Sequence, residues 1–363
     1  MEFTFQVPTE IIVGQACIRK NAEKFSQFGK KALVVKSGSA EKNGSLADVL
    51  HVLGEQGIEA RVLDSVPPNP TPEDVQALCG YAPEFTFVVA VGGGSAIDAA
   101  KGVAILAVND VEPAAMYDRS YPNKPLPIIA VPTTCGTGSE VTAVSVLTVG
   151  DSKQSFSSPH VLPKVAFLDA DYLRTLPMRV LLDTALDALS HSAEAYLLVD
   201  SWSNDMIAEQ AFRNFAKYKD AMLRREFSDE DRALMLYTAT LGGIAIYVGG
   251  TSAVHTMGYP ITVLKDIPHG RACVLTLGEY IEFAYDAKKE KIDTMCALLG
   301  VDGVGGFKEL LKSLIGETVT YTREEIWELV EIAAEPAIKK RNAKPITRED
   351  IFEIYCAALC REQ

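Results

Sequence analysis

Between Lys31 and Leu168 the chain alternates short apolar runs with helical segments, and this alternation limits its possible folds more than any other feature. Strand-like runs at 32–36, 60–63, 87–91, 127–131 and 165–168 are interleaved with helical stretches such as 44–56 and the segment from Pro72. Strands that alternate with helices pair in parallel, because each helix carries the chain back across the sheet. The pattern predicts a doubly wound, mostly parallel, Rossmann-like sheet.

After Asp171 the strand signals stop and helical periodicity continues to the C-terminus. Helices are predicted at 182–199, 203–224, 229–252, 272–299, 304–316, 323–340 and 347–361. We therefore predict an α/β domain over residues 1–178 and an all-α domain over residues 179–363. At the N-terminus, residues 3–7 and 10–13 alternate around Pro8-Thr9 and predict a hairpin. Its exposed edge would join two copies of the chain into a homodimer.

Composition excludes several kinds of partner. A net charge of −13 and a pI near 5.0 argue against nucleic acid and membrane surfaces, because phosphate binding needs clustered Lys and Arg. The first residues lack the features of a signal peptide, and no apolar run suggests a membrane span, so we expect a cytoplasmic location. Seven cysteines without a Cys-x-x-Cys pair indicate neither a disulfide framework nor a zinc knuckle.

Three of the five histidines and one aspartate have a spacing that fits a metal site. Asp187 and His191 lie four residues apart in a run that we interpret as a buried helix, so both side chains share one face. His255 follows an apolar helix, and His269 lies in a predicted loop before another helix. A carboxylate with three imidazoles suits Fe²⁺ or Zn²⁺. Each residue alone could instead be satisfied locally within its own helix.

Two loops that follow apolar strands have the composition of a phosphate-binding site. Gly92-Gly-Gly-Ser95 opens a helix, so its backbone can approach a phosphate while the helix N-terminus supplies amides. It is not the G-x-G-x-x-G fingerprint, and Ser95 with Asp98 could form a capping box. The loop 132–140 has four hydroxyls and two glycines, which suit a site for sugars and phosphates or a plain turn-rich connection.

Together these motifs resemble those of the iron-containing (group III) alcohol dehydrogenases along almost the whole chain. The similar stretches are Asp-Ala-Leu-Ser-His at 187–191, Ala-Val-His-Thr-Met-Gly-Tyr-Pro at 253–260, Ile-Pro-His-Gly at 267–270, Gly-Gly-Gly-Ser-x-x-Asp at 92–98 and Pro-Thr-Thr-x-Gly-Thr-Gly-Ser-Glu at 132–140. The resemblance implies that Asp187, His191, His255 and His269 bind Fe²⁺, and their donor chemistry also allows Zn²⁺.

The resemblance further implies a nicotinamide cofactor bound by the N-terminal domain. The implied contact residues are Gly93, Gly94, Ser95, Asp98, Thr133, Thr134, Thr137, Ser139, Asn69 from a Pro-Asn-Pro turn, and Lys153 from a polar hairpin after the run 144–148. Many family members carry a further His where this chain has Tyr259. We therefore place Tyr259 beside the substrate as the candidate catalytic residue, orienting substrate or water without acting as an essential base.

The residues after the first strand of the sheet predict NADP(H) in preference to NAD(H). An acidic residue at this point commonly holds the ribose 2′-hydroxyl, and NAD-using members of the family tend to have Asp at the position of Ser37. A serine there leaves room for a 2′-phosphate, Ser39 adds a donor and Lys36 adds positive charge. The alternative is a simple Ser-Gly turn.

The expected function is a metal-dependent, NAD(P)-dependent interconversion of a primary alcohol and its aldehyde by hydride transfer, with the metal acting as a Lewis acid. One alternative is a lyase of the dehydroquinate synthase type, which would need several basic residues around the metal ligands that this sequence lacks. Others are a polyol oxidoreductase like glycerol dehydrogenase and a non-catalytic nucleotide-binding protein.

Overall fold

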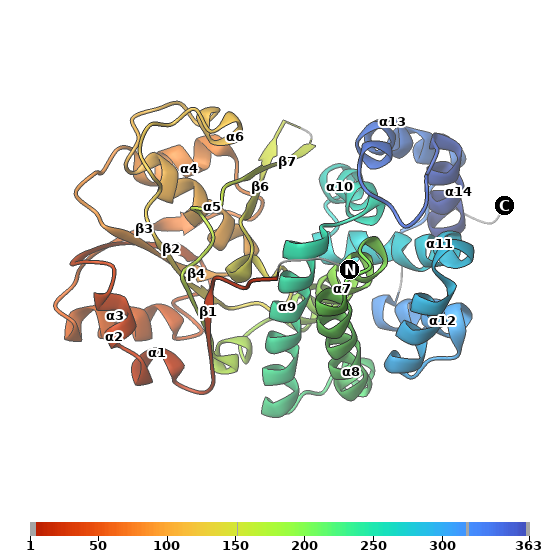
Figure 1. Cartoon of the computed structure of the whole chain (residues 1–363), viewed down its shortest axis with the longest axis horizontal. Coiled ribbons are helices and arrows are strands. Elements are labelled where there is room, and N and C mark those ends of the chain that lie inside the picture. Colours follow the sequence, from red (N-terminus) through yellow and green to blue (C-terminus); the bar gives the residue numbers. More distant parts are fainter. Residues whose placement is uncertain (1–4, 151, 317–318, 361–363) are drawn as a thin grey trace. The chain divides into compact units, whose positions relative to one another are not determined.

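The computed structural model describes residues 5–150, 152–316 and 319–360 and divides the chain into two compact units (Figure 1). One unit runs from Gln6 to Pro177 and contains the sheet. The other contains Phe5 and the chain from Met178 onward, and its regular structure is helical. This is the α/β and all-α architecture that the sequence predicts.

The first unit is built on a six-stranded sheet in the order β1-β8-β5-β4-β2-β3, and all its strand pairs are parallel. The strands are β1 (Glu10–Val13), β2 (Lys31–Ser37), β3 (Glu59–Val66), β4 (Phe87–Gly92), β5 (Ile128–Pro132) and β8 (Val165–Leu168). The chain adds β3 on one side of β2 and β4 on the other. Ligands of doubly wound sheets bind at such a switch point, beyond the carboxyl ends of the strands.

Helices cover both faces of this sheet. Leu33 and Val35 of β2 pack in one cluster with α4 (Pro72–Cys79) and α5 (Gly94–Leu106), whereas Ala32 and Val34 pack in another with α3 (Ser45–Glu55). Alternate residues of a strand point to opposite faces, so a strand buried on both sides must be apolar throughout. The remaining short helices of the unit are α1 (Cys17–Lys20), α2 (Glu23–Ser26), α6 (Ala115–Asp118), η1 (Ser139–Val141) and η2 (Ala170–Leu173).

The predicted N-terminal hairpin is wrong. Residues 5–7 form no strand, and β1 pairs in parallel with β8, while Phe3 and Thr4 lie outside the described residues. Thr9 Oγ1 donates to the carbonyl of Pro163, 2.7 Å away, which anchors β1 to the sheet. Pairing with the large sheet has overridden the local hairpin signal. The second predicted hairpin is confirmed, because β6 (Val144–Val149) and β7 (Ser152–Ser157) pair in antiparallel fashion and Lys153 lies on β7.

The second unit consists of long helices. They are α7 (Met178–Leu198), α8 (Trp202–Arg224), α9 (Asp229–Gly249), α10 (Ala253–Lys265), α11 (His269–Leu299), α12 (Gly303–Ile315), α13 (Arg323–Lys339) and α14 (Arg348–Leu359). Every predicted helix is present, and α10 is additional. A proline normally interrupts a helix, and Pro260 lies inside α10, which is why the sequence pattern hides this helix.

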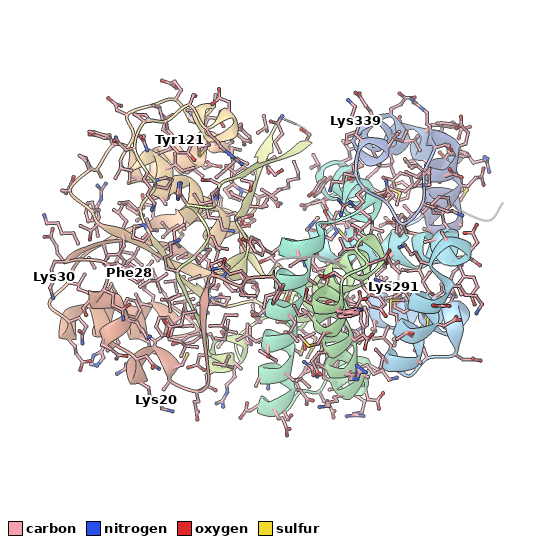
Figure 2. The ribbon with its side chains drawn as sticks, viewed as in Figure 1. Lys20, Phe28, Lys30, Tyr121, Lys291 and Lys339 are labelled. Carbon is pink, nitrogen blue, oxygen red and sulfur yellow. The ribbon has the colours of Figure 1, made fainter. Side chains whose placement is uncertain are left out.

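The centre of the helical unit is α7, which is buried on every side from Leu181 to Leu198. Lys291 of α11, labelled in Figure 2, donates to the carbonyls of Tyr196 and Val199 and so satisfies the C-terminal end of α7. Helix α9 packs against α7 and α8. It is long and apolar enough to cross a membrane by length and composition, which corrects the sequence expectation, but 56% of its apolar window is buried, as in a core helix.

Candidate functional site

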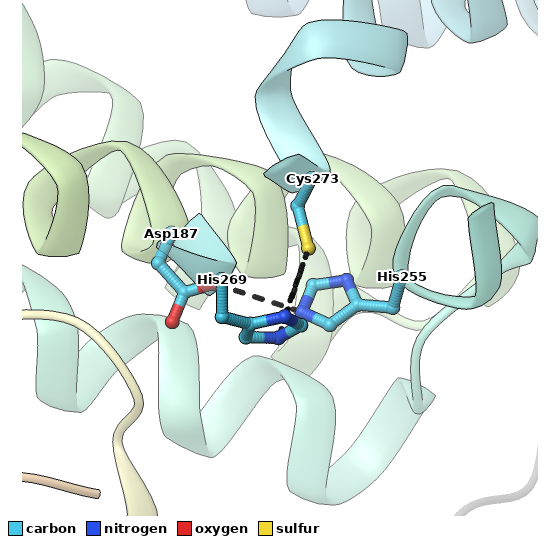
Figure 3. A group of neighbouring side chains, drawn as sticks. All are labelled: Asp187, His255, His269 and Cys273. Carbon is cyan, nitrogen blue, oxygen red and sulfur yellow. Dashed lines mark hydrogen bonds and ion pairs between the residues drawn. The ribbon is translucent and has the colours of Figure 1, made fainter. Parts of the chain in front are cut away.

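Three helices of the second unit bring a group of metal-binding side chains together (Figure 3). Asp187 comes from α7, His255 from the first turn of α10, and His269 and Cys273 from the first turns of α11. One potential ligand atom from each of the four lies within 4.8 Å of the others. His269 is the first residue of α11, and Pro268 precedes it. The sequence placed His269 in a loop before a helix that began at residue 272, whereas the helix begins about one turn earlier and includes His269.

His191 lies in the same cluster, on the face of α7 that carries Asp187. Its Nε2 is 3.9 Å from Asp187 Oδ1, and its ring stacks on that of His255 with centroids 4.6 Å apart. The four residues that the sequence singles out as metal ligands therefore lie together. Three of them, Asp187, His191 and His255, are at least 95% buried.

Two buried atoms in this cluster fit a divalent cation. Asp187 Oδ1 and His255 Nε2 lie 3.7 Å apart, and neither has a hydrogen-bond partner among the described residues. Buried polar atoms in proteins are nearly always bonded, because an unsatisfied one costs about 1–3 kcal/mol. A cation held between the carboxylate oxygen and the imidazole nitrogen would satisfy both atoms.

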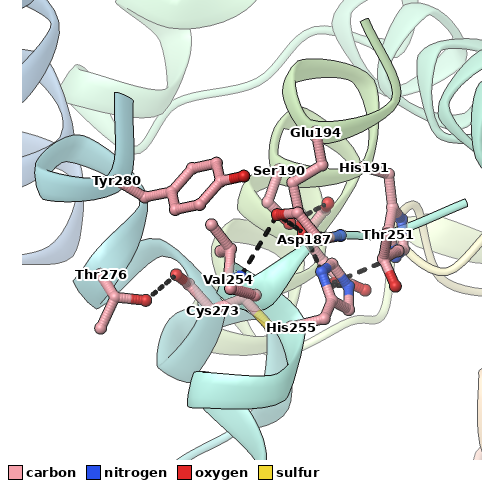
Figure 4. Close-up of polar contacts among 12 residues, drawn as sticks. Asp187, Ser190, His191, Glu194, Thr251, Val254, His255, Cys273, Thr276 and Tyr280 are labelled. Atoms are coloured by element: carbon pink, nitrogen blue, oxygen red, sulfur yellow. Dashed lines mark hydrogen bonds and ion pairs between the residues drawn. The ribbon is translucent and has the colours of Figure 1, made fainter. Parts of the chain in front are cut away.

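Glu194, which the sequence analysis missed, fixes the orientation of His255 (Figure 4). Its Oε1 is bonded to His255 Nδ1, and its Oε2 accepts from the backbone N and the Oγ of Ser252 at 2.7 and 2.6 Å. Burial alone would raise the pKa of Glu194, but His255 and Ser252 outweigh it and lower the pKa to about 2. A carboxylate on Nδ1 leaves Nε2 free to face the candidate metal position, as in many metal-binding histidines. The one sequence signal that could have identified Glu194 is its helical spacing, three residues after His191.

Glycines let the three helices approach closely. A Cβ on Gly270 would lie 2.1 Å from the carbonyl oxygen of Asp183 and 2.7 Å from the Cβ of Asp187, distances that real Cβ atoms do not show. A Cβ on Gly258 would lie 2.9 Å from the Sγ of Cys273. The glycine in Ile-Pro-His-Gly is therefore a packing requirement that sets His269 beside α7.

Tyr259 lies one turn after His255 on α10 and stacks on His269. The two ring centroids are 5.4 Å apart and the planes differ by 18°. The structure thus places the candidate catalytic residue in contact with a candidate metal ligand.

In the first unit, the glycine loop lies at the switch point of the sheet. A Cβ on Gly92 would lie 2.9 Å from the Cβ of Ser37, at the end of the neighbouring strand β2. Cβ atoms on Gly93 and Gly94 would come within 2.8 Å of Thr134 and 2.5 Å of Thr137. No side chain caps α5, whose first residues are Gly94 and Ser95, so the N-terminus of this helix has the form expected of a phosphate site.

The alternative capping box between Ser95 and Asp98 is absent. The carboxylate of Asp98 instead accepts from Ser139 Oγ at 2.5 Å and from the backbone N of Val146 at 3.0 Å. Lys101, a further residue that the sequence analysis missed, is fully buried and donates to Ser139 Oγ at 2.5 Å and to the carbonyl of Val144 at 2.6 Å. Burial lowers the pKa of Lys101, and Asp98 opposes this shift. These hydrogen bonds connect the loop 132–140 to α5.

The other predicted cofactor residues form two groups. Lys153 Nζ donates to Asn69 Oδ1 and to Thr148 Oγ1, both at 2.8 Å, so the two predicted contacts from separate segments meet. Burial lowers the pKa of Lys153 from its ordinary 10.5 to about 8, although Asp98 opposes the shift. Thr133, also predicted, is fully buried, and its Oγ1 has no hydrogen-bond partner among the described residues.

The second group lies at the end of β2 and in the turn that follows, where Ser37 Oγ and Ser39 Oγ are 3.0 Å apart. Lys36 is mostly buried, donates to Ser65 Oγ at 2.6 Å and pairs with Glu41 at 3.0 Å. Its charge is therefore partly neutralised within the chain.

Comparison with known families finds a match along nearly the whole chain. Residues 8–170 match the model of the iron-containing alcohol dehydrogenases, and residues 181–359 match that of the C-terminal part of the Fe-containing alcohol dehydrogenase family. The chain belongs to the iron-containing alcohol dehydrogenase family. Curated relatives within the family include lactaldehyde reductase of Escherichia coli, 28% identical over 91% of this chain and 92% of the relative. The 1,3-propanediol dehydrogenase of Klebsiella pneumoniae is 33% identical over 84% of this chain and 81% of the relative.

Solved structures of iron-containing alcohol dehydrogenases share the fold. One from Thermotoga maritima has a TM-score of 0.89 and 34% identity over 99% of each chain. Sulfoacetaldehyde reductase from Bifidobacterium kashiwanohense, in complex with NAD⁺, has a TM-score of 0.87 and 28% identity over 100% of each chain. The family membership makes this protein an oxidoreductase that interconverts alcohols and aldehydes, and it implies a metal, iron, and a nicotinamide cofactor.

Proposed function

We propose that this protein is an NADP(H)-dependent alcohol dehydrogenase or aldehyde reductase whose metal is bound by Asp187, His191, His255 and His269. The observation that carries the metal assignment is the pair of buried, unsatisfied atoms Asp187 Oδ1 and His255 Nε2. A carboxylate and imidazoles suit Fe²⁺ and also accept Zn²⁺. When bound, such a cation acts as a Lewis acid on the substrate oxygen while the nicotinamide carries the hydride.

The protein's own residues have three roles in this proposal. Glu194 keeps the Nε2 of His255 directed at the metal position, through its bond to Nδ1. Tyr259, stacked on His269, supplies a hydroxyl that orients the substrate or a water molecule. The N-terminus of α5 and the loop 133–139 bind the pyrophosphate and the nicotinamide end of the cofactor through Gly93, Gly94, Ser95, Thr133, Thr134 and Thr137, while Asp98 and Ser139 hold that loop in place.

The metal assignment is tested by His269→Ala, with His51→Ala as the matched control because His51 is a half-exposed histidine on α3. We expect His269→Ala to lose both bound metal, measured by atomic emission, and aldehyde reduction. The control should lose neither. Full metal content and turnover in His269→Ala would show that the site is misassigned.

We also propose that NADP(H) is preferred over NAD(H). Ser37 and Ser39 offer two hydroxyls at the end of β2, and neither repels a 2′-phosphate as an aspartate would. The pair between Lys36 and Glu41 moderates the positive charge, so the two serines carry the preference. The ratio of kcat/KM for NADPH to that for NADH should exceed one, and Ser37→Asp should shift it toward NADH. A higher value for NADH in the unaltered protein would refute this part of the proposal.

A further inference from the structure

The candidate metal cluster contains a thiol that the Asp and His ligand set does not use. Cys273 lies one turn after His269 on α11, and its Sγ is 3.7 Å from both ring nitrogens of that histidine (Figure 3). The side chain is fully buried. Gly258 on α10 leaves the space that this sulfur occupies, because a Cβ there would lie 2.9 Å from Sγ.

The four candidate ligand atoms of this group lie within 4.8 Å of one another, so small side-chain rotations would bring them to a tetrahedral metal site. With metal–sulfur bonds of about 2.3 Å and metal–nitrogen bonds of about 2.0–2.1 Å, neighbouring ligand atoms of a tetrahedron lie roughly 3.4–3.6 Å apart. Asp187 Oδ1 is 3.7 Å from His255 Nε2, close to this range. These two atoms are also the buried pair without hydrogen bonds. Cys273 Sγ is 3.7 Å from both ring nitrogens of His269, so the imidazole would turn to direct one nitrogen at a metal shared with the sulfur.

We propose that Cys273 is an alternative fourth metal ligand, which forms with Asp187, His255 and His269 a closed tetrahedral site for a thiophilic divalent metal such as Zn²⁺. This inference rests on the proposed function, because the two ligand sets share three residues. The thiol releases its proton to solvent as the sulfur–metal bond forms. A harder ion such as Fe²⁺ gains less from sulfur and is bound by the set that contains His191.

The closed set has a functional consequence. Zn²⁺ in a structural site is almost always four-coordinate, so these four protein ligands would leave no position for substrate, whereas Fe²⁺ held by Asp187 and the three histidines can accept the substrate oxygen as a further ligand. Zinc bound through Cys273 would therefore hold the enzyme in an inactive state. Activity would then depend on which metal is bound, because zinc bound through Cys273 inactivates the enzyme and Fe²⁺ does not.

The test uses Co²⁺ as a spectroscopic probe, added to the full-length protein after removal of metal by a chelator. Visible d–d bands report that Co²⁺ is bound, and a near-ultraviolet thiolate-to-cobalt charge-transfer band reports a sulfur ligand. We expect both in the unaltered protein. Cys273→Ser should keep the d–d bands and lose the charge-transfer band. Cys296→Ser, which alters another buried cysteine of α11, should keep both.

Metal competition gives a second readout. Cys273→Ser should lower the affinity for Zn²⁺ relative to Fe²⁺ by about tenfold or more, measured against a chelator, and should relieve inhibition by Zn²⁺. Visible bands without a charge-transfer band in the unaltered protein would overturn this inference and leave the proposed metal site intact. If neither band forms, the proposed metal site fails and the inference fails with it.

Discussion

Among single residues, Tyr259 combines two contributions that one pair of variants separates. Its ring supports His269 by stacking, and its hydroxyl is the group proposed to contact substrate. A neutral phenol is a weak proton acceptor, so the proposed role of the hydroxyl is to orient the substrate or a water molecule. Tyr259→Phe keeps the ring, so kcat should fall less than about 100-fold, which is the low end for loss of a general acid or base. Metal content should not change.

Tyr259→Ala removes the stacked ring as well and should lower metal content along with kcat. Steady-state kinetics measure kcat and atomic emission measures metal content, and both measurements on both variants separate the role of the ring from that of the hydroxyl. A loss of several orders of magnitude in Tyr259→Phe, with metal retained, would show that the hydroxyl carries the proton.

We expect Lys153, a proposed cofactor contact, to make cofactor binding depend on pH. Its pKa of about 8 means that the ammonium is present below this pH and is lost above it. The cofactor is anionic, so its Kd should be constant at lower pH and rise as pH passes about 8. A charge-assisted hydrogen bond contributes about 1.5–3 kcal/mol, and the total rise should therefore be roughly tenfold or more.

Fluorescence titration with NADPH across this pH range measures the effect. Lys153→Arg provides the control, because a guanidinium does not titrate in this range and should flatten the profile. The same rise in Lys153→Arg would assign it to another group.

Spacing in the sequence predicts candidate metal ligands within one helix, because the helical repeat determines which residues share a face. Asp187 and His191 share a face of α7 through their separation of four, and the structure confirms that they lie together. Glu194, Lys101 and Cys273 were missed for a different reason. Glu194 and Lys101 act on residues of other segments, whereas Cys273 lies one turn after His269 on the same helix. A buried glutamate, lysine or cysteine within a helix has no local pattern that distinguishes it from a solvated or packing residue.

At the scale of elements, the close contact of α11 with α7 depends on Gly270. Gly270→Ala would place a Cβ 2.1 Å from the carbonyl oxygen of Asp183, a backbone atom, so one helix must move. Overpacking of this kind costs about 1–3 kcal/mol. The same displacement moves His269, so metal affinity should fall together with stability.

Urea denaturation and metal content measure both effects. Gly305→Ala in α12 is the matched control, because a Cβ there meets no atom within 4 Å and alanine favours the helix by about 1 kcal/mol. It should be neutral or stabilising. Unchanged stability and metal content in Gly270→Ala would contradict the role of this contact.

Elements were predictable where one local signal dominates. The apolar runs of β2, β4 and β5 are buried on both faces of the sheet, and sequence alone locates them. Two elements were misjudged where a distant partner decides the outcome. Helix α10 tolerates Pro260 within a packed unit, and β1 joins β8, which follows it by some 150 residues. Contacts over such distances do not leave a periodic trace in the chain.

For the whole molecule, the order of the strands carries information that alternation alone does not. Alternating strands and helices predict a parallel sheet, but they do not specify that β2 and β4 are neighbours at the switch point. That adjacency is what sets Ser37 beside Gly92, and so joins the residues proposed for the cofactor ribose to those proposed for its phosphates.

The same order leaves β1 at one edge of the sheet, and we expect the protein to form a homodimer through this edge. Within the described residues, β8 is the sole strand paired with β1. Glu10 donates its backbone N–H to Lys164 of the adjoining segment, so by alternation Ile11 and Val13 direct theirs away from the sheet. An unpaired edge of this kind is a template for a second chain.

Ile11→Pro tests this interface because it removes an outward donor and leaves the ladder with β8 in place. Light scattering at micromolar concentration should give twice the chain mass of 39.3 kDa for the unaltered protein and 39.3 kDa for Ile11→Pro. Far-ultraviolet circular dichroism should be the same for both, which separates loss of association from loss of fold. A single-chain mass for the unaltered protein would refute the dimer. A dimeric Ile11→Pro would place the interface elsewhere, since a proline at this position cannot supply the N–H that edge pairing with a second strand requires.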